Sequence, residues 1–306
     1  MELRQFTYVN MVASCGSFTK AATMLFISQP ALSNYINKVE EELGVKLFDR
    51  SANPLTLTYA GEQYLKRARI VLDQIDNMNR EMRDITHHMT GRIKLGFPGE
   101  RIIYMLPLML TPFKNRYPGI EVEVKTGPGN WLLENLRSGE VDFVFLPTWV
   151  EQKDIAYETV AEDELVLVAS AGYLKDKHFL DREKRIINWR TVSDLPLITL
   201  QKGHAMRSSM DVLYRNLGKK PDILLESHSN MLSYRLAAQG LGFTVVPEIT
   251  LELMQGGMPA EAYHLSDPPV TWTVNALYRR DCYIGEVERA LLTITKEVLA
   301  AHKKRL

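Results

Sequence analysis

Apolar side chains recur at intervals of three and four in three short segments at the start of the chain, the spacing of amphipathic helices. The buried stripes would be formed by Leu3, Phe6, Val9 and Ala13, then Ala21, Ala22 and Leu25, then Leu32, Ile36, Val39 and Leu43. Gly16 and Gly44 are placed to end helices, and Ser17 and Ser28 to N-cap them. Pro30 falls in the first turn of the third helix, where its missing N–H costs nothing. The pattern predicts a helix-turn-helix.

The following residues predict a small β wing and one long helix. Residues 47–50 and 53–58 form two short strand patterns around a turn, and Thr58 is an N-cap candidate. A seam of alternating three- and four-residue spacing is formed by Leu65, Ala68, Leu72, Ile75, Asn79 and Met82. Arg67, Arg69, Arg80 and Arg83 are expected on the outside of this helix. Such a seam favours a two-stranded coiled coil that joins two copies, although a helix packed on its own domain is the alternative.

From residue 91 the pattern changes to strands that alternate with helices. Strands are predicted at 92–97, 120–125, 141–146, 165–169, 197–200, 223–226, 243–247 and 272–278. Helices are predicted at 103–117, 131–138, about 206–216, 231–239 and about 284–301. This alternation is typical of an α/β fold with mainly parallel sheets and helices on both faces.

Composition narrows the class of protein without naming it. The 306 residues are 45% apolar, with 37 basic and 37 acidic side chains, which indicates several folded domains and no general affinity for nucleic acid. Cys15 and Cys282 are the only cysteines and suit a reducing compartment. The start of the chain lacks a signal region and no run approaches about 18 apolar residues, so a cytoplasmic protein is expected, with no membrane partner.

Short polar side chains gather at the start of the third helix, opposite its buried stripe. They can approach base edges, thymine methyl groups and phosphates in a major groove. The candidate DNA-binding residues are Thr19, Ser28, Gln29, Pro30, Ala31, Ser33, Asn34, Asn37, Lys38 and Arg50. Three amphipathic helices that only build a core are the alternative. Residues 1–60 carry five basic and five acidic side chains, so one copy should bind weakly, and several should act together.

The series resembles the LysR-type transcriptional regulator family. The resemblance lies in Gly16-Ser17-Phe18, Ala21-Ala22, the run from Ser28 to Ser33, the run from Leu43 to Arg50, and Leu57-Thr58-Tyr59-Ala60-Gly61. Two departures are Asn34-Tyr35, where similar proteins often have a basic residue followed by Gln, and a wing without a basic cluster.

The resemblance implies an α/β multidomain protein with three parts. These are a winged helix-turn-helix over 1–58, a linker and dimerisation helix over 59–90, and an effector-binding domain over 91–306 that resembles periplasmic binding proteins. Its two Rossmann-like lobes would be 91–162 with 268–306, and 163–267, with crossings near 161–164 and 266–270. The implied partners are double-stranded promoter DNA, a small-molecule effector, RNA polymerase, and further copies in a homodimer or homotetramer.

Ligands of such folds bind beyond the carboxyl ends of the strands. The candidate effector-binding residues are Pro98, Gly99, Glu100, Gly129, Asn130, Pro147, Thr148, Thr199, Gln201, Asn230 and Val246. Asn130 and Ser229 are expected to N-cap helices whose free N–H groups favour an anion. Glu100 would instead favour an amine, and thus an amino-acid-like effector, if it faces the cleft, or it simply begins a helix. Trp131 and Trp149 are an aromatic wall of the cleft or part of the core.

Other chemistry has little support in the sequence. His87-His88 are adjacent on a helix and point apart, which disfavours a metal site, and His204 and His228 either titrate with an effector or are ordinary loop residues. No cofactor-binding or catalytic motif is recognisable. The alternative to a regulator is a solute-binding or enzymatic α/β protein with an accessory helix-turn-helix. Such an enzyme would need a nucleophile with its base, and no spacing supplies one.

Overall fold

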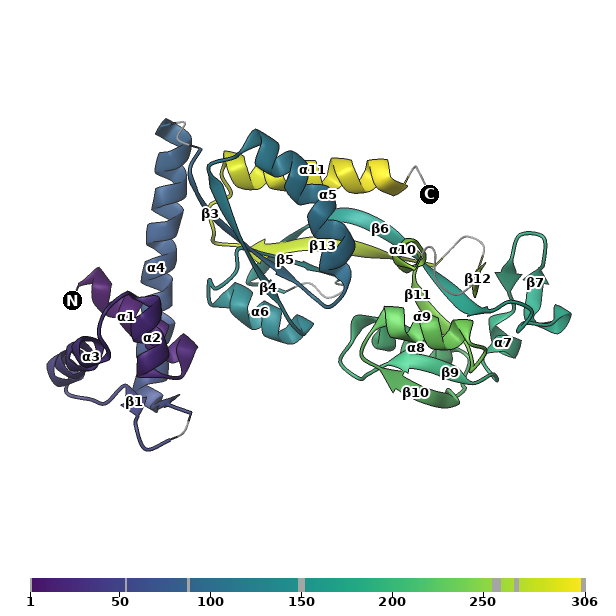
Figure 1. The fold of residues 1–306 in the computed structure, drawn as a ribbon, viewed down its shortest axis with the longest axis horizontal. Helices are drawn as coiled ribbons and strands as arrows, with labels where there is room; N and C mark the ends of the chain where they lie inside the picture. Colours follow the sequence, from purple (N-terminus) through teal and green to yellow (C-terminus); the bar gives the residue numbers. More distant parts are fainter. Residues whose placement is uncertain are drawn as a thin grey trace. The chain divides into compact units, whose positions relative to one another are not determined.

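The computed structural model describes residues 2–52, 54–86, 89–147, 152–254, 260–266 and 270–303. The chain forms two compact units (Figure 1). Unit 1 comprises Met1–Met89, Arg137–Glu140 and Asp281–Glu286, and unit 2 comprises Thr90–Leu136, Val141–Arg280 and Val287–Leu306. None of the described helices combines the length and the apolar character needed to span a bilayer.

Unit 1 begins with three helices: α1 (Leu3–Cys15), α2 (Phe18–Met24) and α3 (Gln29–Leu43). The predicted caps are confirmed. Ser17 Oγ accepts the Lys20 N–H at 3.4 Å, Ser28 Oγ accepts the Ala31 N–H at 3.3 Å, and Gly16 and Gly44 end α1 and α3 in the left-handed region. Their core holds Val9, Val12, Ala21, Ala22, Leu32, Ile36, Val39, Leu47, Phe48 and Leu65. The expected burial of Leu3 and Leu43 is wrong, because both side chains lie at helix ends that the core does not cover.

The wing is an antiparallel pair of short strands, β1 (Phe48–Asp49) and β2 (Thr56–Leu57), as predicted. A buried carboxylate holds it to α3. Glu40 accepts the Leu47 N–H at 2.9 Å, the Phe48 N–H at 3.2 Å and Lys46 Nζ at 2.9 Å. Burial acts to raise the pKa of Glu40, but these hydrogen bonds outweigh it and hold the pKa below its ordinary value.

The long helix α4 (Tyr59–Thr86) is capped by Thr58, whose Oγ1 accepts the Gly61 N–H at 3.0 Å. A Cβ at Gly61 would lie 1.9 Å from the Leu47 carbonyl oxygen, so only glycine lets this helix pass so close to the wing. Toward its other end, Asn77 Oδ1 accepts the Tyr283 N–H at 3.0 Å, and Asp84 Oδ2 accepts the Glu286 N–H at 2.9 Å. The helix is therefore held at both ends within unit 1.

Two expectations for α4 need correction. Arg80 and Arg83 are buried and not on the outside. Leu65 and Ala68 of the predicted seam are buried within unit 1, so they are not open to a second copy. The exposed apolar stripe shares Met82 with that seam, and its other residues, Ile70, Val71, Met78 and Ile85, lie beside it.

Unit 2 contains a first lobe of three parallel strands, β3 (Gly91–Phe97), β4 (Ile120–Thr126) and β5 (Phe143–Leu146). Helix α6 (Gly129–Arg137) covers one face, where Leu132 and Leu136 pack on Val144 and Leu146. Since strand side chains alternate, Phe143 and Phe145 face the other side, where α5 (Arg101–Arg116) and α11 (Glu286–Lys303) lie side by side (Figure 1). The lobe is thus a sheet with helices on both faces.

Two long antiparallel strands, β6 (Ile155–Ser170) and β13 (Thr271–Arg279), connect the lobes. The sequence predicted only residues 165–169 of β6, because the three consecutive acidic residues 162–164 interrupt the apolar pattern of its first half. The resulting nine-stranded sheet has the order β4-β3-β5-β13-β6-β12-β8-β7, with β11 also paired to β6. Its pairs through β6 and β13 are antiparallel, so the expectation of mainly parallel sheets is corrected to a mixed sheet.

The second lobe packs helices around β6, β11 (Thr244–Pro247) and the parallel pair β9 (Leu197–Leu200) and β10 (Ile223–Ser227). Its main helices are α8 (Ala205–Asn216) and α9 (Asn230–Ala238). Six short elements were not predicted: 3-10 helix η1 (Asp176–His178), β7 (Phe179–Asp181), β8 (Ile186–Ile187), α7 (Trp189–Val192), α10 (Ile249–Leu253) and β12 (Ala260–His264). They contain only two to five residues each, too few to show a period.

Candidate functional site

The start of α3 presents the polar surface that the sequence predicted. Leu32 and Ile36 turn into the core, so the opposite side of the helix faces outward. Thr19, Ser28, Gln29, Pro30, Ala31, Asn34, Lys38 and Arg50 are exposed, and Ser33 and Asn37 are partly exposed. We call these ten residues the α3 face. Acidic side chains are absent from the first turn of α3, so the Gln29 N–H and the positive end of the helix are open to an anion, although Pro30 has no N–H and Ser28 accepts that of Ala31.

Part of the α3 face is already organised by hydrogen bonds. Arg50 Nη2 donates to Asn37 Oδ1 at 2.5 Å, and Arg50 Nη1 donates to Ser33 Oγ at 3.3 Å. The guanidinium also lies 4.9 Å from the centre of the Phe18 ring. The wing thereby fixes Arg50 beside the helix, while its remaining N–H groups can meet a phosphate.

The unusual Tyr35 has a structural explanation. Its ring lies edge-on against Tyr8, with ring centres 5.0 Å apart, and its hydroxyl donates to Glu2 at 3.5 Å. Tyr35 thus packs α3 on α1, and base contacts fall to its neighbours. Phe26 was not among the predicted residues, although it is 96% exposed at the tight turn, with a positive φ of 55°. The sequence does place an aromatic residue between Leu25 and Ile27, just before the N-cap Ser28, and this position could have indicated an exposed ring.

In unit 2, Glu100 connects the two lobes. It precedes α5 in the first lobe, and its carboxylate reaches the N-terminus of α9 in the second. The Ser229 hydroxyl donates to Glu100 Oε1, and the Met231 N–H donates to Oε1 at 3.2 Å and to Oε2 at 3.3 Å. The two alternatives for Glu100 are therefore both partly right, because it precedes a helix and also faces the opposite lobe.

Arg101, the next residue, lies at the centre of a group that the sequence analysis did not assemble. It is only 8% exposed, its Nη1 donates to the Tyr104 hydroxyl at 2.8 Å, and its guanidinium lies 5.4 Å from the Trp272 ring centre. Burial raises the pKa of Asp163 to about 6, against the opposing charge of Arg101. Burial, together with the charge of Arg101, lowers the pKa of His204. These side chains come from both lobes and both connecting strands.

Several buried polar atoms of the two lobes have no hydrogen-bond partner among the described residues. They include Arg101 Nε, Thr199 Oγ1, Asn230 Oδ1 and Ser233 Oγ. Thr199 and Ser233 are 4% and 1% exposed. Because unsatisfied buried polar atoms are rare and costly, these atoms are suited to contact a polar ligand or ordered water.

The other predicted effector residues lie in different surroundings, and two of the predictions are wrong. Pro98, Gly99 and Gly129 lie at ends of β3 and α6, Pro147 follows β5, and Gln201 bonds His228 at 3.2 Å. The prediction that Asn130 caps a helix is wrong, because α6 already begins at Gly129. Val246 is fully buried in the second lobe with Val166 and Val168, so its side chain is core and does not line a cleft. Trp131 is half-exposed and lies against Gly127, while His87, His88, Thr148 and Trp149 fall outside the described residues.

Comparison with known proteins agrees with both units. Residues 3–62 match the bacterial regulatory helix-turn-helix proteins of the lysR family, and residues 86–300 match the LysR substrate binding domain. The chain belongs to the LysR family. It is therefore a DNA-binding transcriptional regulator with an effector-binding domain, and not an enzyme.

Relatives of this LysR-type regulator include two bacterial proteins that align over most of their length. The HTH-type transcriptional regulator BsdA of Bacillus subtilis (strain 168) is 28% identical over 96% of this chain and 100% of its own. The HTH-type transcriptional activator CmpR of Synechocystis sp. is 28% identical over 82% of this chain and 80% of its own.

Solved structures share the fold. A full-length OxyR variant from Pseudomonas aeruginosa has a TM-score of 0.78 at 22% identity, covering 98% of this chain and 94% of that one. Full-length CbnR complexed with its target DNA has a TM-score of 0.63 at 20% identity, covering 98% and 99%.

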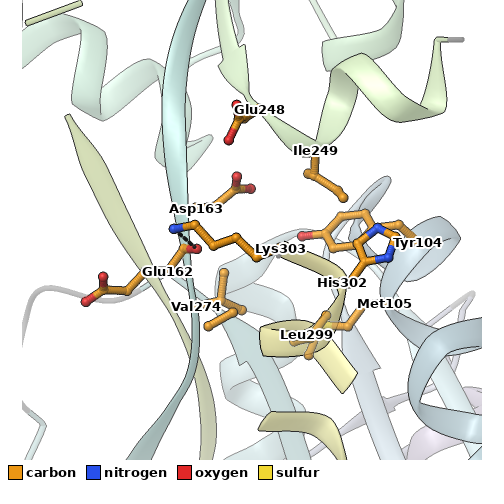
Figure 2. A pocket seen from close by; sticks show the side chains of 11 residues that line it. Tyr104, Met105, Glu162, Asp163, Glu248, Ile249, Val274, Leu299, His302 and Lys303 are labelled. Carbon is orange, nitrogen blue, oxygen red and sulfur yellow. Dashed lines mark hydrogen bonds between the residues drawn. The ribbon is translucent and has the colours of Figure 1, made fainter. Parts of the chain in front are cut away.

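The regulator also has a pocket of about 460 Å³, a volume that includes its open mouth, beside the connecting strands (Figure 2). Tyr104, Met105 and Leu299 form an apolar side, and Asp163, Glu248 and Lys303 a polar one. Lys303 Nζ donates to the Glu162 carbonyl at 3.1 Å. None of the residues that line this pocket belongs to the predicted effector set, so the pocket is a different place from that set.

Proposed function

We propose that the α3 face binds base edges and phosphates of promoter DNA, and that a small metabolite bound between the lobes of unit 2 controls this binding. The observation that carries the first part is the polar, exposed side of α3, opposite a fully buried stripe and at an N-terminus free of acidic side chains. The solved structure of CbnR, which has a similar fold, in complex with its target DNA supports this part of the proposal. Such a regulator would work in the cytoplasm.

We test which residues contact bases and which contact phosphates by comparing random DNA with DNA that the protein has selected from a random-sequence pool. Gln29→Ala should reduce the preference for selected over random DNA by about tenfold, because a base contact supplies roughly 1–3 kcal/mol of discrimination. Lys38→Ala is the matched control: it should weaken both DNAs alike and reduce the slope of log affinity against log salt by about one. An unchanged preference in Gln29→Ala would remove Gln29 from base recognition.

We further propose that copies associate along α4 through the exposed apolar stripe. Val71, Met78 and Ile85 recur at the heptad spacing that suits a second helix. A homodimer or homotetramer would place several DNA-binding domains on one promoter and compensate for the low charge of each. RNA polymerase is the expected further partner, since a regulator acts through the enzyme that initiates transcription.

For the sensor we propose a small polar effector that contacts Arg101 and Thr199, two of the buried residues with an unsatisfied polar atom. This revises the predicted site, because Arg101 replaces Val246 and Asn130 in it. An effector shifts the protein only to the extent that it binds one arrangement of the lobes more tightly than the other. The coupling to DNA is then reciprocal: promoter DNA changes effector affinity by the same factor.

A further inference from the structure

The N-terminus of α9 has the donors of an anion-binding place. The Ser229 hydroxyl and the Met231 N–H converge there, and Ser233 Oγ, buried and unpaired among the described residues, lies one helical turn further along the same side. We call Ser229 Oγ and the Met231 N–H the α9 seat. A helix N-terminus with free donors is suited to hold an anionic group of a ligand.

In this protein the α9 seat is occupied by a side chain of the chain itself. Glu100 lies 129 positions before Ser229 in the sequence, in the other lobe, and both of its oxygens are within 3.3 Å of the Met231 nitrogen. No local turn brings these groups together, so only the approach of the two lobes places the carboxylate there. A carboxylate already bound is a competitor at very high local concentration for any carboxylate from solution.

Resting on the proposal that the cleft takes the effector, we propose that Glu100 is a specificity-determining residue of that cleft. Its carboxylate excludes anionic ligand groups from the α9 seat, so the effector presents a hydroxyl or an ammonium group, and not a carboxylate, at this place. The anionic part of an effector, where there is one, goes to Arg101. The same contact holds the lobes together until a ligand that pairs with Glu100 replaces it.

Acetate is the direct probe, because it is the Glu100 carboxylate without its tether. Glu100→Ala should bind acetate at least about tenfold more tightly than the wild type, as expected when an internal group occupies the seat in nine molecules of ten. The measurement is calorimetric titration at constant ionic strength, with acetamide as the neutral analogue. The double variant Glu100→Ala/Ser229→Ala also lacks the Ser229 hydroxyl donor, so the gain in acetate affinity should be abolished.

Glu123→Gln is the matched control, since it removes a partly exposed carboxylate of the same unit that lies on β4 and pairs with Arg92. Equal acetate affinity in the wild type and Glu100→Ala would overturn the proposal, and so would a gain that Glu123→Gln reproduces. DNA binding of the same proteins is measured in parallel. If the wild type does not bind DNA, the proposed function is contradicted, whereas the conclusion from acetate binding is unaffected.

A second measurement covers the case in which Glu100→Ala does not fold. Glu100→Gln keeps the shape and one acceptor but removes the charge, so the seat should be held less firmly. Hydrogen exchange of a peptide spanning residues 229–233 should then be at least about threefold faster than in the wild type, because a charge-assisted hydrogen bond is lost. Unchanged exchange would show that Glu100 does not hold the α9 seat.

Discussion

Helices α3 and α9 begin in the same way and are used differently. Each follows a serine whose hydroxyl accepts the N–H three residues later, Ala31 at 3.3 Å and Leu232 at 3.1 Å. The first turn of α3 is exposed and contains no acidic residue. The first turn of α9 receives the carboxylate of Glu100 from the other lobe. One anion-binding end is open and the other is filled.

The difference shows that a cap motif predicts a place for an anion but not its occupant. Both ends have a capping serine and the positive end of the helix dipole, but Pro30 of α3 lacks the N–H that Met231 supplies at the same position of α9. At α3 the nearby Arg50 adds positive charge, which suits phosphates arriving from outside. At α9 the chain supplies the negative charge itself, through Glu100.

The largest expected effect comes from closing the open end with a carboxylate. Gln29→Glu would place a carboxylate at the start of α3, although without the N–H contact that Met231 gives Glu100. DNA affinity should fall about a thousandfold, because a base contact is lost and a negative charge faces the phosphates. The unfolding temperature should stay equal or rise, since an acid at a helix N-terminus stabilises it by about 0.3–1 kcal/mol. Fluorescence anisotropy and calorimetry measure the two effects; a variant that keeps its DNA affinity would show that α3 does not face DNA.

The next effect is a dependence on pH that has opposite sign in the two units. In unit 2, burial raises the pKa of Asp163 from 3.8 to about 6. The folded state therefore binds more protons than the unfolded state between these values, and stability falls as pH rises from about 4 to 6. Asp163→Asn lacks this fall, so its stability relative to the wild type should increase by about 3 kcal/mol over that interval.

Urea unfolding followed by tryptophan fluorescence reports unit 2 alone, because Trp131, Trp149, Trp189 and Trp272 all lie in it. If the difference in unfolding free energy between Asp163→Asn and the wild type stays constant from pH 4 to 6, the raised pKa of Asp163 is contradicted. Glu40 in unit 1 provides the opposite case, because hydrogen bonds lower its pKa from 4.5. The stability that Glu40 contributes is present above about pH 4.5 and is lost as pH falls through its folded pKa. The stability of Glu40→Gln, followed by circular dichroism, should therefore fall less steeply in acid than that of the wild type.

The smallest effects come from the two capping serines. Ser28→Ala should cost about 1 kcal/mol, the usual contribution of an N-cap. Ser229→Ala should cost about 2 kcal/mol, because it removes the cap and also the hydroxyl that donates to Glu100. Chemical unfolding of each variant gives the two values. Equal costs would mean that the Glu100 contact adds nothing to the stability of unit 2.

Local patterns account for what could be predicted. Ser17, Ser28 and Ser229 were identified as caps because capping depends on residues within three positions, and the wing and the start of α4 followed from strand and turn patterns. The short strands and helices of the second lobe were missed, since two to five residues show no period.

Long-range contacts account for most of what could not be predicted. Glu100 meets Met231 across 131 positions, and Arg101 meets Trp272 on a connecting strand, so neither pair leaves a mark in the sequence near it. Arg80 and Arg83 have the pattern of surface residues and are buried because unit 1 folds over them. Val246 was assigned to the cleft from its strand end, although strand side chains alternate and this one turns into the core.

The central claim is that α3 offers an open anion-binding face to DNA while the corresponding end of α9 is internally filled. Hydrogen exchange of the full-length protein with and without its selected DNA tests both halves in one measurement. Peptides that cover residues 28–34 should become protected when DNA is added, by about tenfold in exchange rate if binding orders the first turn. Peptides covering residues 229–233 should gain no comparable protection. Protection of residues 229–233 without protection of residues 28–34 would contradict the account.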